Sequence, residues 1–454
     1  IDRMWRALLL VSVALPAALS SLVDVDKDKG QVWAVLVAGS NTYDNYRHQA
    51  DVCHAYQILH RNGVPDSNII VMMYDDIANN PSNPKKGKIF NKPGGPNVYG
   101  PKAVNKDYVG DDVTPENFVH VLTGNHEAVR GVGSGKVLKS GPNDHVFVNF
   151  VDHGAPGLIG FPSDVMLADD LIRALKTMNK KKMYKKLVFY MEACESGSMF
   201  DKILPKNIEI FATTAANPTE SSYACYWSDE VQAYLGDEYS VSWMEDTDAA
   251  EKHKRFSSET LLKQYKNVVK RVKESHPSMY GERTIDKDHV QDFLGKSKQQ
   301  VTFYSESPSQ LESFTDAVPS RDVPLHVLTK KIALAETAEE KEKLQKEKED
   351  LVKGRKEIDQ LLSRIVSHVT NLDIEKIQNI ETTRQDINLD MMPCYKTLVK
   401  AFSEKCVNIH KNLYTFSHLY KLANMCALQY SSTDILEAFS AECGSLHQEM
   451  VNVN

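Results

Sequence analysis

The stretch KKLVFYMEACESGSMF, residues 185–200, joins an apolar run to a reactive side chain. The run from Leu187 to Met191 is nearly continuous, which is typical of a strand buried on both faces of a parallel sheet. It ends at Cys194, and small polar residues follow at 196–198. In open parallel sheets, functional groups gather at the carboxyl ends of the strands. The stretch therefore predicts a strand that holds a thiol at a sheet edge, with room beside it for a ligand.

Four further apolar runs of this kind are separated by helical patterns such as Gln49–Asn62 and Pro115–Arg130. The alternation predicts an α/β fold with a parallel-rich sheet between helices. The Gly/Pro/Asn-rich segment 79–100 is long enough to be a surface loop with a role of its own. The four runs are Val32–Ser40, Asn68–Tyr74, Asp144–Gly154 and Ile208–Thr214.

The chain has 454 residues, of which 42% are hydrophobic and 25% charged, so two or three packed domains are expected. Its net charge of −7 gives no indication of a nucleic-acid partner. Residues 1–21 carry Arg3 and Arg6, a short apolar run and then small residues, the pattern of a secretory signal peptide. No later run is long and apolar enough for a membrane span. We therefore expect a protein of the secretory pathway with neither a membrane nor a nucleic-acid partner.

Beyond residue 300 the composition changes. Ser, Pro and Asp are frequent from Tyr304 to Pro324, which predicts a linker, and the chain after it is helical in pattern. Apolar residues recur every seventh position from Leu344 to Ile365, so a coiled coil is one interpretation. Glu347 and Gly354 stand at the partner positions, which favours an amphipathic helix lying on another domain.

The seven cysteines are unevenly distributed. Four cluster near the C-terminus and predict two disulfides in an oxidising compartment, with the pairing left open by the spacing. Because three cysteines remain, at least one thiol stays free. Cys53 and Cys225 fit small buried hydrophobes. No CxxC or HxxxH spacing accompanies them, so we expect no metal and no cofactor.

A second predicted strand ends in Asp152-His153-Gly154. If it neighbours the strand before Cys194, the imidazole of His153 and the thiol meet above the same sheet edge. Histidine can activate a cysteine in two ways: it accepts the thiol proton as a base, and the resulting positive charge stabilises the thiolate. The backbone amides of Gly154 and Cys194 could then stabilise the oxyanion formed by attack on a peptide carbonyl. Asn45 is the candidate for orienting the imidazole.

Several longer motifs resemble one family, the legumains or asparaginyl endopeptidases. The resemblance runs from about Val32 to Phe293 and resumes at DVPLHVLTKK (322–331) and in the C-terminal cysteine pattern. It implies a caspase-like α/β fold followed by an all-α prodomain, and cleavage on the carboxyl side of Asn. The motifs include NYRHQADVCHAYQILHRNG (45–63), DHGAPG (152–157), EACESGSM (192–199) and TTAANPTESSYACYW (213–227).

The same resemblance assigns roles and boundaries. It implies Cys194 as nucleophile, His153 as base and Asn45 as the orienting residue. It makes residues 22–300 a catalytic domain with a short leader, 301–335 a linker with the activation segment, and 336–454 a helical prodomain. The pairing that it implies for the disulfides is Cys394–Cys426 and Cys406–Cys443. Its specificity pocket maps onto Arg47, His48, Glu192, Ser221, Ser222 and Asp237.

The chemistry of this pocket fits an asparagine side chain. A carboxamide has one accepting and one donating end. Arg47 can donate to its oxygen, while Glu192 and Asp237 can accept from its nitrogen. An ionised aspartate would be repelled, but a protonated one would mimic Asn. We therefore expect Asp cleavage to appear as the pH falls.

The resemblance also implies a zymogen whose C-terminal helices cap the cleft at neutral pH and leave in acid. We expect Lys353, Arg355, Lys356 and Arg364 to meet the acidic pocket. The implied partners are protein and peptide substrates, the chain's own prodomain and cystatin-type inhibitors. The implied location is the lysosome or another acidic vesicle, or secretion.

Two features depart from the family pattern. Residues 301–370 contain no Asn, so processing of the linker would use Asp316, Asp322, another nearby Asx or a different protease. The leader offers Asp24, Asp26 and Asp28 for trimming. The chain also has no N-x-Ser/Thr acceptor without proline at x, which argues against sorting through N-linked sugars.

Three alternatives stay open at this level. A peptide ligase or transpeptidase at Asn would use the same acyl-enzyme. The catalytic subunit of the GPI transamidase shares the His and Cys motifs, but the prodomain and the lack of an anchor argue against it. A catalytically silent binding protein would tolerate the loss of His153 or Cys194, and both are present.

Overall fold

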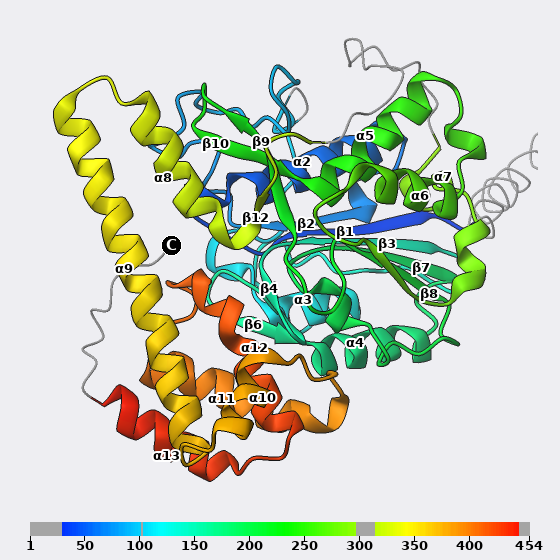
Figure 1. Ribbon diagram of the computed structural model, residues 1–454. Coiled ribbons are helices and arrows are strands. Elements are labelled where there is room, and N and C mark those ends of the chain that lie inside the picture. Colours follow the sequence, from blue (N-terminus) through cyan, green and yellow to red (C-terminus); the bar gives the residue numbers. More distant parts are fainter. Residues whose placement is uncertain (1–29, 101–102, 297–313, 445–454) are drawn as a thin grey trace, which may run out of the picture.

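The computed structural model describes residues 30–100, 103–296 and 314–444 (Figure 1). The predicted signal peptide, the leader with its three aspartates and the first part of the linker lie outside them. The centre of the molecule is a six-stranded sheet with the order β11-β8-β7-β3-β1-β2, parallel except for β11 at the edge. Its strands are β1 (Val32–Ala38), β2 (Ile69–Met73), β3 (His145–Val151), β7 (Lys186–Glu192), β8 (Ile210–Thr214) and β11 (Ser278–Gly281).

Helices cover both faces of this sheet (Figure 1). Alternate residues of β1 point to opposite sides: Ala34 and Leu36 belong to one hydrophobic core, Val35 and Val37 to the other. This explains why the strands read as continuous apolar runs. On the first face lie α2 (Tyr46–Arg61), α5 (Glu238–Lys252), α6 (Leu261–Arg271) and α7 (Gln291–Leu294), and on the second α3 (Pro115–Leu122) and α4 (Ala168–Lys180).

Two small sheets lie beside the main one. The first contains β4 (Gly154–Ala155), β5 (Leu158–Gly160) and β6 (Val165–Leu167), and the second β9 (Tyr223–Ser228), β10 (Ala233–Asp237) and β12 (Val318–Pro319). Because β12 and the helix after it belong to the range predicted as a linker, that range contains regular structure.

The prediction of a helix over Pro115–Arg130 was too long. α3 ends at Leu122, and Gly124 then adopts a φ of +67°. A side chain there would come within 2.9 Å of the carbonyl oxygen of Leu138. Glycine is therefore required where the chain turns away from the helix.

The C-terminal part is helical, as predicted. Figure 1 shows α8 (Val323–Leu334) and α9 (Ala338–Val369) as a hairpin beside the sheet domain, with the other helices packed below. Leu351, Ile358 and Ile365 of α9 are buried in the core shared by the prodomain and the second face of the sheet domain, which confirms the amphipathic-helix interpretation. The remaining helices are α10 (Ile374–Thr382), α11 (Met392–Lys405), α12 (Leu419–Ala427) and α13 (Ser432–Cys443).

Two disulfides tie these helices together. They join Cys394 to Cys426 and Cys406 to Cys443, with Cα–Cα distances of 5.8 and 5.0 Å. Loops of this length correspond to about 3–4 kcal/mol in the chain-entropy model. Cys53, Cys194 and Cys225 are free and buried. Within the described ranges, every helix is too short or too polar to cross a bilayer.

Candidate active site

The strand ends that carry the imidazole and the thiol are neighbours, as expected. β3 and β7 pair in parallel with Val151 opposite Glu192, and the amide of Asp152 donates to the Glu192 carbonyl at 3.0 Å. The two chains stay close beyond the pairing, because a Cβ on Gly154 would lie 2.3 Å from the carbonyl oxygen of Cys194. Only glycine fits this approach.

The imidazole of His153 is oriented by Asn45. Asn45 Nδ2 donates to the carbonyl of Asn41 at 2.9 Å, so its Oδ1 faces His153 Nε2 at 2.7 Å. Nε2 must then carry the proton, which leaves the lone pair of the neutral ring on Nδ1. Burial, together with the positive charges of Arg47 and Arg321, lowers the pKa of His153 well below its usual range. The ring is therefore neutral and able to accept a proton.

The thiol of Cys194 is almost fully covered, with 1% of the residue exposed. In the described part of the chain its sulfur contacts Ser221 Oγ at 3.2 Å, Ser222 Oγ at 3.6 Å and the Ser222 amide at 3.3 Å, rather than His153. The next residue, Glu195, adopts a left-handed φ of 48°. Such backbone strain is found where the surrounding structure holds a functional group in place.

A buried arginine lies at the centre of the predicted specificity pocket. Arg47 is fully buried and donates from Nε to Asp237 Oδ1 at 2.8 Å and from Nη1 to the carbonyl of Asp44 at 3.2 Å. Its remaining nitrogen, Nη2, is buried and has no acceptor in the part of the chain that the structure describes. A buried donor left in this state costs about 1–3 kcal/mol unless a ligand satisfies it.

Two buried carboxyl groups complete the pocket. Glu192 Oε2 accepts from the amide and the hydroxyl of Ser240, both at 3.0 Å, at the start of α5. Among the described residues, no N–H lies within hydrogen-bond distance of Glu192 Oε1 or Asp237 Oδ2. Burial and the neighbouring Asp237 raise the pKa of Glu192 well above its usual range. The pocket thus offers one unpaired donor on Arg47 and two oxygen atoms that receive no N–H from the described residues.

His48 lies between this pocket and the predicted base. Its Nδ1 is 2.6 Å from Ser40 Oγ and 3.5 Å from Asp152 Oδ1, and its ring meets that of His153 edge-on at 5.0 Å. His48, Asp152 and His153 also form a buried group with ligand atoms within 4.8 Å of one another. Both imidazoles have other roles in the predicted site, His48 in the pocket and His153 as the base, and we assign no metal here.

A segment from the C-terminal part covers the thiol. β12 pairs antiparallel with β9, and the amide of Ser320 donates to the carbonyl of Ser222 at 2.9 Å. The Ser320 hydroxyl lies 3.2 Å from Ser222 Oγ and also interacts with Asp237. Upstream, the carboxylate of Asp316 accepts from two backbone amides of β9 at 3.1 and 2.6 Å. The segment therefore lies along the cleft like an added strand.

Two arginines hold this segment down. Arg321 pairs with Glu195 and donates to the carbonyl of Gly154 at 3.2 Å. Arg355 of α9 pairs with Asp322 at 2.7 Å and donates to the carbonyl of Arg321 at 2.7 Å. Glu195, directly after the thiol, is thus linked to the prodomain.

The prediction that four basic residues of the C-terminal helices meet the acidic pocket was wrong. None of the side chains of Lys353, Arg355, Lys356 and Arg364 contacts the described carboxyl groups of the pocket. Arg355 acts through the linker segment instead of through the pocket. Lys353 pairs with Glu357 within α9, Arg364 pairs with Glu442 of α13, and Lys356 is exposed. These side chains project from a helix that lies beside the cleft, so they cannot reach the buried carboxyl groups.

Sequence reasoning missed several residues of the site. Ser320 and Arg321 stand in a segment that reads as a plain linker, and Ser240 reads as an ordinary helix residue. Asp51 and Asn91, described below, lie behind the pocket. Asp51 belongs to the same motif as Arg47, four residues on, and that helical spacing was the one signal available.

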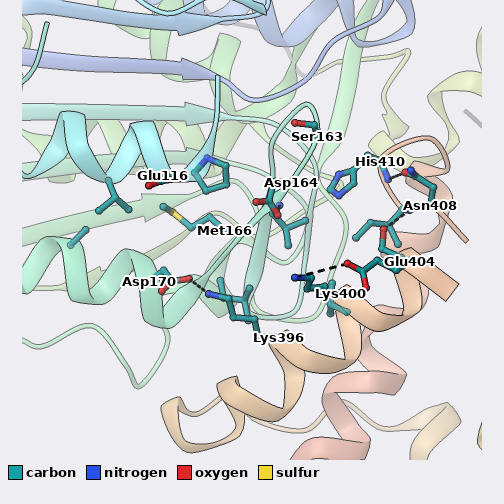
Figure 2. A pocket seen from close by; sticks show the side chains of 18 of the residues that line it. Glu116, Ser163, Asp164, Met166, Asp170, Lys396, Lys400, Glu404, Asn408 and His410 are labelled. Carbon is teal, nitrogen blue, oxygen red and sulfur yellow. Dashed lines mark hydrogen bonds and ion pairs between the residues drawn. The ribbon is translucent and has the colours of Figure 1, made fainter. Parts of the chain in front are cut away.

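A large cavity in the described part of the molecule lies away from this site, between the sheet domain and the helical C-terminal part. Figure 2 shows Lys396 of α11 pointing to Asp170 of α4, with Asp164 and His410 on the far side. The cavity measures about 1410 Å³, and neither the thiol nor the imidazole lines it. It is a feature of the contact between the prodomain and the sheet domain.

A thiol and an oriented neutral imidazole at adjacent strand ends, beside a pocket closed by the chain itself, define a cysteine peptidase. Comparisons with known proteins narrow this class. The Peptidase C13 family model matches residues 32–296, and the model of the legumain prodomain matches residues 346–443. The chain therefore belongs to the peptidase C13, or legumain, family, and it is a cysteine endopeptidase with a prodomain.

Individual relatives are similar in sequence to this chain over nearly its whole length. Legumain from Rattus norvegicus is 46% identical over 448 residues, covering 97% of this chain and 99% of that protein. The vacuolar-processing enzyme delta-isozyme from Arabidopsis thaliana is 43% identical over 437 residues, 91% of each. A solved caspase-1 from Spodoptera frugiperda covers 60% of this chain and 93% of its own, with 10% identity and a TM-score of 0.36, too low for a conclusion to rest on it.

Proposed function

We propose that the protein hydrolyses peptide bonds after Asn, and after Asp in acid, and that it is made as a zymogen. The observation that supports this best is a set of buried pocket atoms, judged among the described residues: Arg47 Nη2 is a donor without an acceptor, and Glu192 Oε1 and Asp237 Oδ2 are oxygen atoms that receive no N–H. An asparagine side chain supplies one acceptor and two donors.

The chemistry would run through an acyl-enzyme. The thiol of Cys194, turned from the serines toward His153, loses its proton to Nδ1 and attacks the scissile carbonyl. The amides of Gly154 and Cys194 would stabilise the oxyanion. His153 then protonates the leaving amine, and water, activated by the same imidazole, releases the acid product. Asn45 keeps the ring in the required tautomer throughout.

Paired peptides that differ only in Asn or Asp at the cleavage position test this proposal. After acid activation of the full-length protein, cleavage of the Asn peptide is expected at all acidic pH values. Cleavage of the Asp peptide is expected to rise relative to it as the pH falls toward about 4, where the free Asp carboxyl becomes protonated. The ratio of the two kcat/KM values, measured from pH 4 to 7, checks this.

An Asp-to-Asn ratio that does not change with pH would contradict the assignment of the pocket. Mass spectrometry of the products in the presence of an added peptide amine distinguishes hydrolysis from ligation. A protein that cleaves neither peptide, with its fold intact, would contradict the proposed function itself.

The covered thiol supports the zymogen proposal. Arg321 places a positive charge near His153 and so disfavours the imidazolium that would accompany a thiolate. Removal of the segment would relieve this effect and uncover the sulfur. The contacts that hold the segment use the carboxylates of Glu195 and Asp322, so acid, by protonating carboxylates, is expected to weaken them.

A substitution at Ser320 tests whether the segment occupies the cleft as an inhibitor. Ser320 lies against Ser222 and Asp237 but lacks a carboxamide. Ser320→Asn would supply one beside the thiol, so self-cleavage after residue 320 is expected to become roughly 10-fold faster or more on acidification. Gel electrophoresis and mass spectrometry of the new N-terminus at Arg321 measure it.

Ser320→Ala is the matched control, because it changes the side chain without adding an amide and should leave the cut site unchanged. If the Asn variant is processed at the same position and rate as the Ala variant, Ser320 does not lie in a productive subsite.

We further propose that the protein passes through the secretory pathway to an acidic vesicle or is secreted. The signal-like pattern of residues 1–21 supports this, as does the vacuolar name of a plant relative. Protein and peptide substrates and the chain's own prodomain are its partners, and cystatin-type inhibitors are proposed partners of the uncovered cleft. The boundaries at residues 22, 301 and 336 remain proposals.

A further inference from the structure

A carboxyl group that the mechanism does not use lies directly behind the specificity pocket. Asp51 is fully buried on α2, four residues after Arg47 and hence on the same face of the helix. Its Oδ1 accepts from Asn91 Nδ2 at 2.7 Å. Asn91 comes from the long loop after β2. Its Nδ2 also donates to the carbonyl of Leu235, and its Oδ1 faces His54 Nδ1, so its orientation is fixed.

Among the described residues, no N–H faces the second oxygen of Asp51 or that of Asp237, although the Ser320 hydroxyl also interacts with Asp237. The side chains of the two residues are in hydrogen-bonding contact with each other. Two carboxylates cannot share a hydrogen bond without a proton, and two like charges this close in a buried site do not both ionise. One of the pair must therefore be protonated.

The surroundings decide which one holds the proton. Asp237 receives the Nε–H of Arg47, which favours its ionised form. Asp51 has only the neutral amide of Asn91, so the proton resides on Asp51. Burial and the charge of Asp237 raise the pKa of Asp51 well above its usual range, and the Asn91 hydrogen bond lowers it only in part. The other titratable groups around the pair are Arg47, His48, Cys53 and His54 of α2, Asp152 after β3, Glu192 of β7 and Cys225 of β9.

We propose that Asp51 is a positioning residue for substrate specificity: held protonated, it donates to Asp237 and fixes that carboxylate for the amide nitrogen of the substrate's asparagine. This rests on the proposed function of the pocket. Asp51 touches no substrate and acts only through Asp237. Loss of its proton at higher pH sets two negative charges against each other, which displaces the acceptor and weakens the binding of Asn.

Two substitutions at this position test the proposal. Asp51→Asn supplies an N–H to Asp237 and an oxygen to Asn91, so it reproduces the protonated carboxyl without a titrating group. Asp51→Ala removes both contacts. With full-length protein activated in acid, Asp51→Ala is expected to lower kcat/KM for an Asn peptide by about 10-fold or more. Asp51→Asn restores cleavage and moves the alkaline limb of the kcat/KM profile upward by about one pH unit or more.

Asp246→Asn is the matched control. Asp246 is also buried, accepts from an asparagine, Asn267 Nδ2, at 2.8 Å, and has a second oxygen without a donor. Burial and Glu259 raise its pKa to about 7. It lies on α5 away from the pocket, so its replacement should leave the alkaline limb in place.

The outcomes separate the two proposals. Wild-type protein that does not cleave Asn peptides contradicts the proposed function. Wild-type cleavage with the same alkaline limb in Asp51→Asn contradicts the role of Asp51 alone. If Asp51→Asn does not fold, infrared difference spectra of the zymogen at neutral pH decide. In the difference between wild type and Asp237→Asn, one carbonyl band of a protonated carboxyl should disappear, because Arg47 is then free to balance an ionised Asp51. Bands of other buried carboxyl groups, such as Glu192, stay in both proteins, and a difference spectrum without a lost band contradicts the proposal.

Discussion

Cys194→Ala is expected to abolish peptide cleavage, with kcat/KM for an Asn peptide falling by about 10⁴–10⁶. In the proposed mechanism the acyl-enzyme forms on the sulfur of Cys194, and neither of the two other free thiols is placed to replace it. Cys53 and Cys225 are buried, and burial raises the pKa of each thiol. The measurement is the initial rate at pH about 5 after acid activation of the full-length protein by an added protease, since a dead variant cannot process itself.

Cys53→Ala is the control for this experiment. It also removes a buried thiol from the same domain, but it leaves the strand ends intact and should retain activity. Residual activity of Cys194→Ala within 10-fold of the wild type would mean that another group performs the attack. Loss of activity in both variants, with normal folding, would point to a general role of thiols rather than to a nucleophile.

Arg47→Met is expected to have the second largest effect. It removes the donor assigned to the substrate carboxamide and leaves Asp237 without its buried positive partner. Breaking a buried ion pair in this way costs about 3–5 kcal/mol of stability. A site that loses the hydrogen bond defining its substrate loses about 10³-fold or more in kcat/KM. Urea unfolding measures the loss of stability, and steady-state kinetics with the Asn peptide measure the loss in kcat/KM.

Arg61→Met separates recognition from stability. Arg61 lies on the same helix and pairs with Asp248 and Glu251, so its loss should also destabilise the protein. It lies two turns or more from the pocket and should preserve the kcat/KM of the folded enzyme. Equal kinetic losses in the two variants would show that Arg47 contributes to stability alone.

The fold was predictable because its main signals are local. Runs such as Leu187–Met191 must be buried on both faces, and alternation with helical patterns leaves few arrangements other than a parallel sheet between helices. The end of α3 was not predicted. After Leu122 the chain turns at Gly124, and the amide of Leu138 donates to the carbonyl of Val121 at 3.1 Å, a contact that no local pattern reveals.

The strand-end rule also placed His153 beside Cys194, since parallel neighbours end at the same edge. The prediction that basic residues of the C-terminal helices meet the acidic pocket was wrong because it did not rest on a geometric rule. Lys353, Lys356 and Arg364 were chosen by charge alone, and charge does not reveal which way a helix faces. The segment that covers the thiol is held by backbone hydrogen bonds of β12 and by ion pairs such as Arg321–Glu195, which join residues far apart in the chain and which composition does not reveal.

The sequence by itself determined the α/β class, the helical C-terminal part, the thiol and imidazole at strand ends, and the motifs of the pocket. These depend on the order of residues along one element, where periodicity and spacing are direct consequences of backbone geometry. Only the tertiary structure decided which linker residues close the cleft and which carboxyl group stands behind Asp237. Such contacts join residues far apart in the chain. The protonation of the buried carboxyl groups depends on burial, and burial exists only once the core has formed.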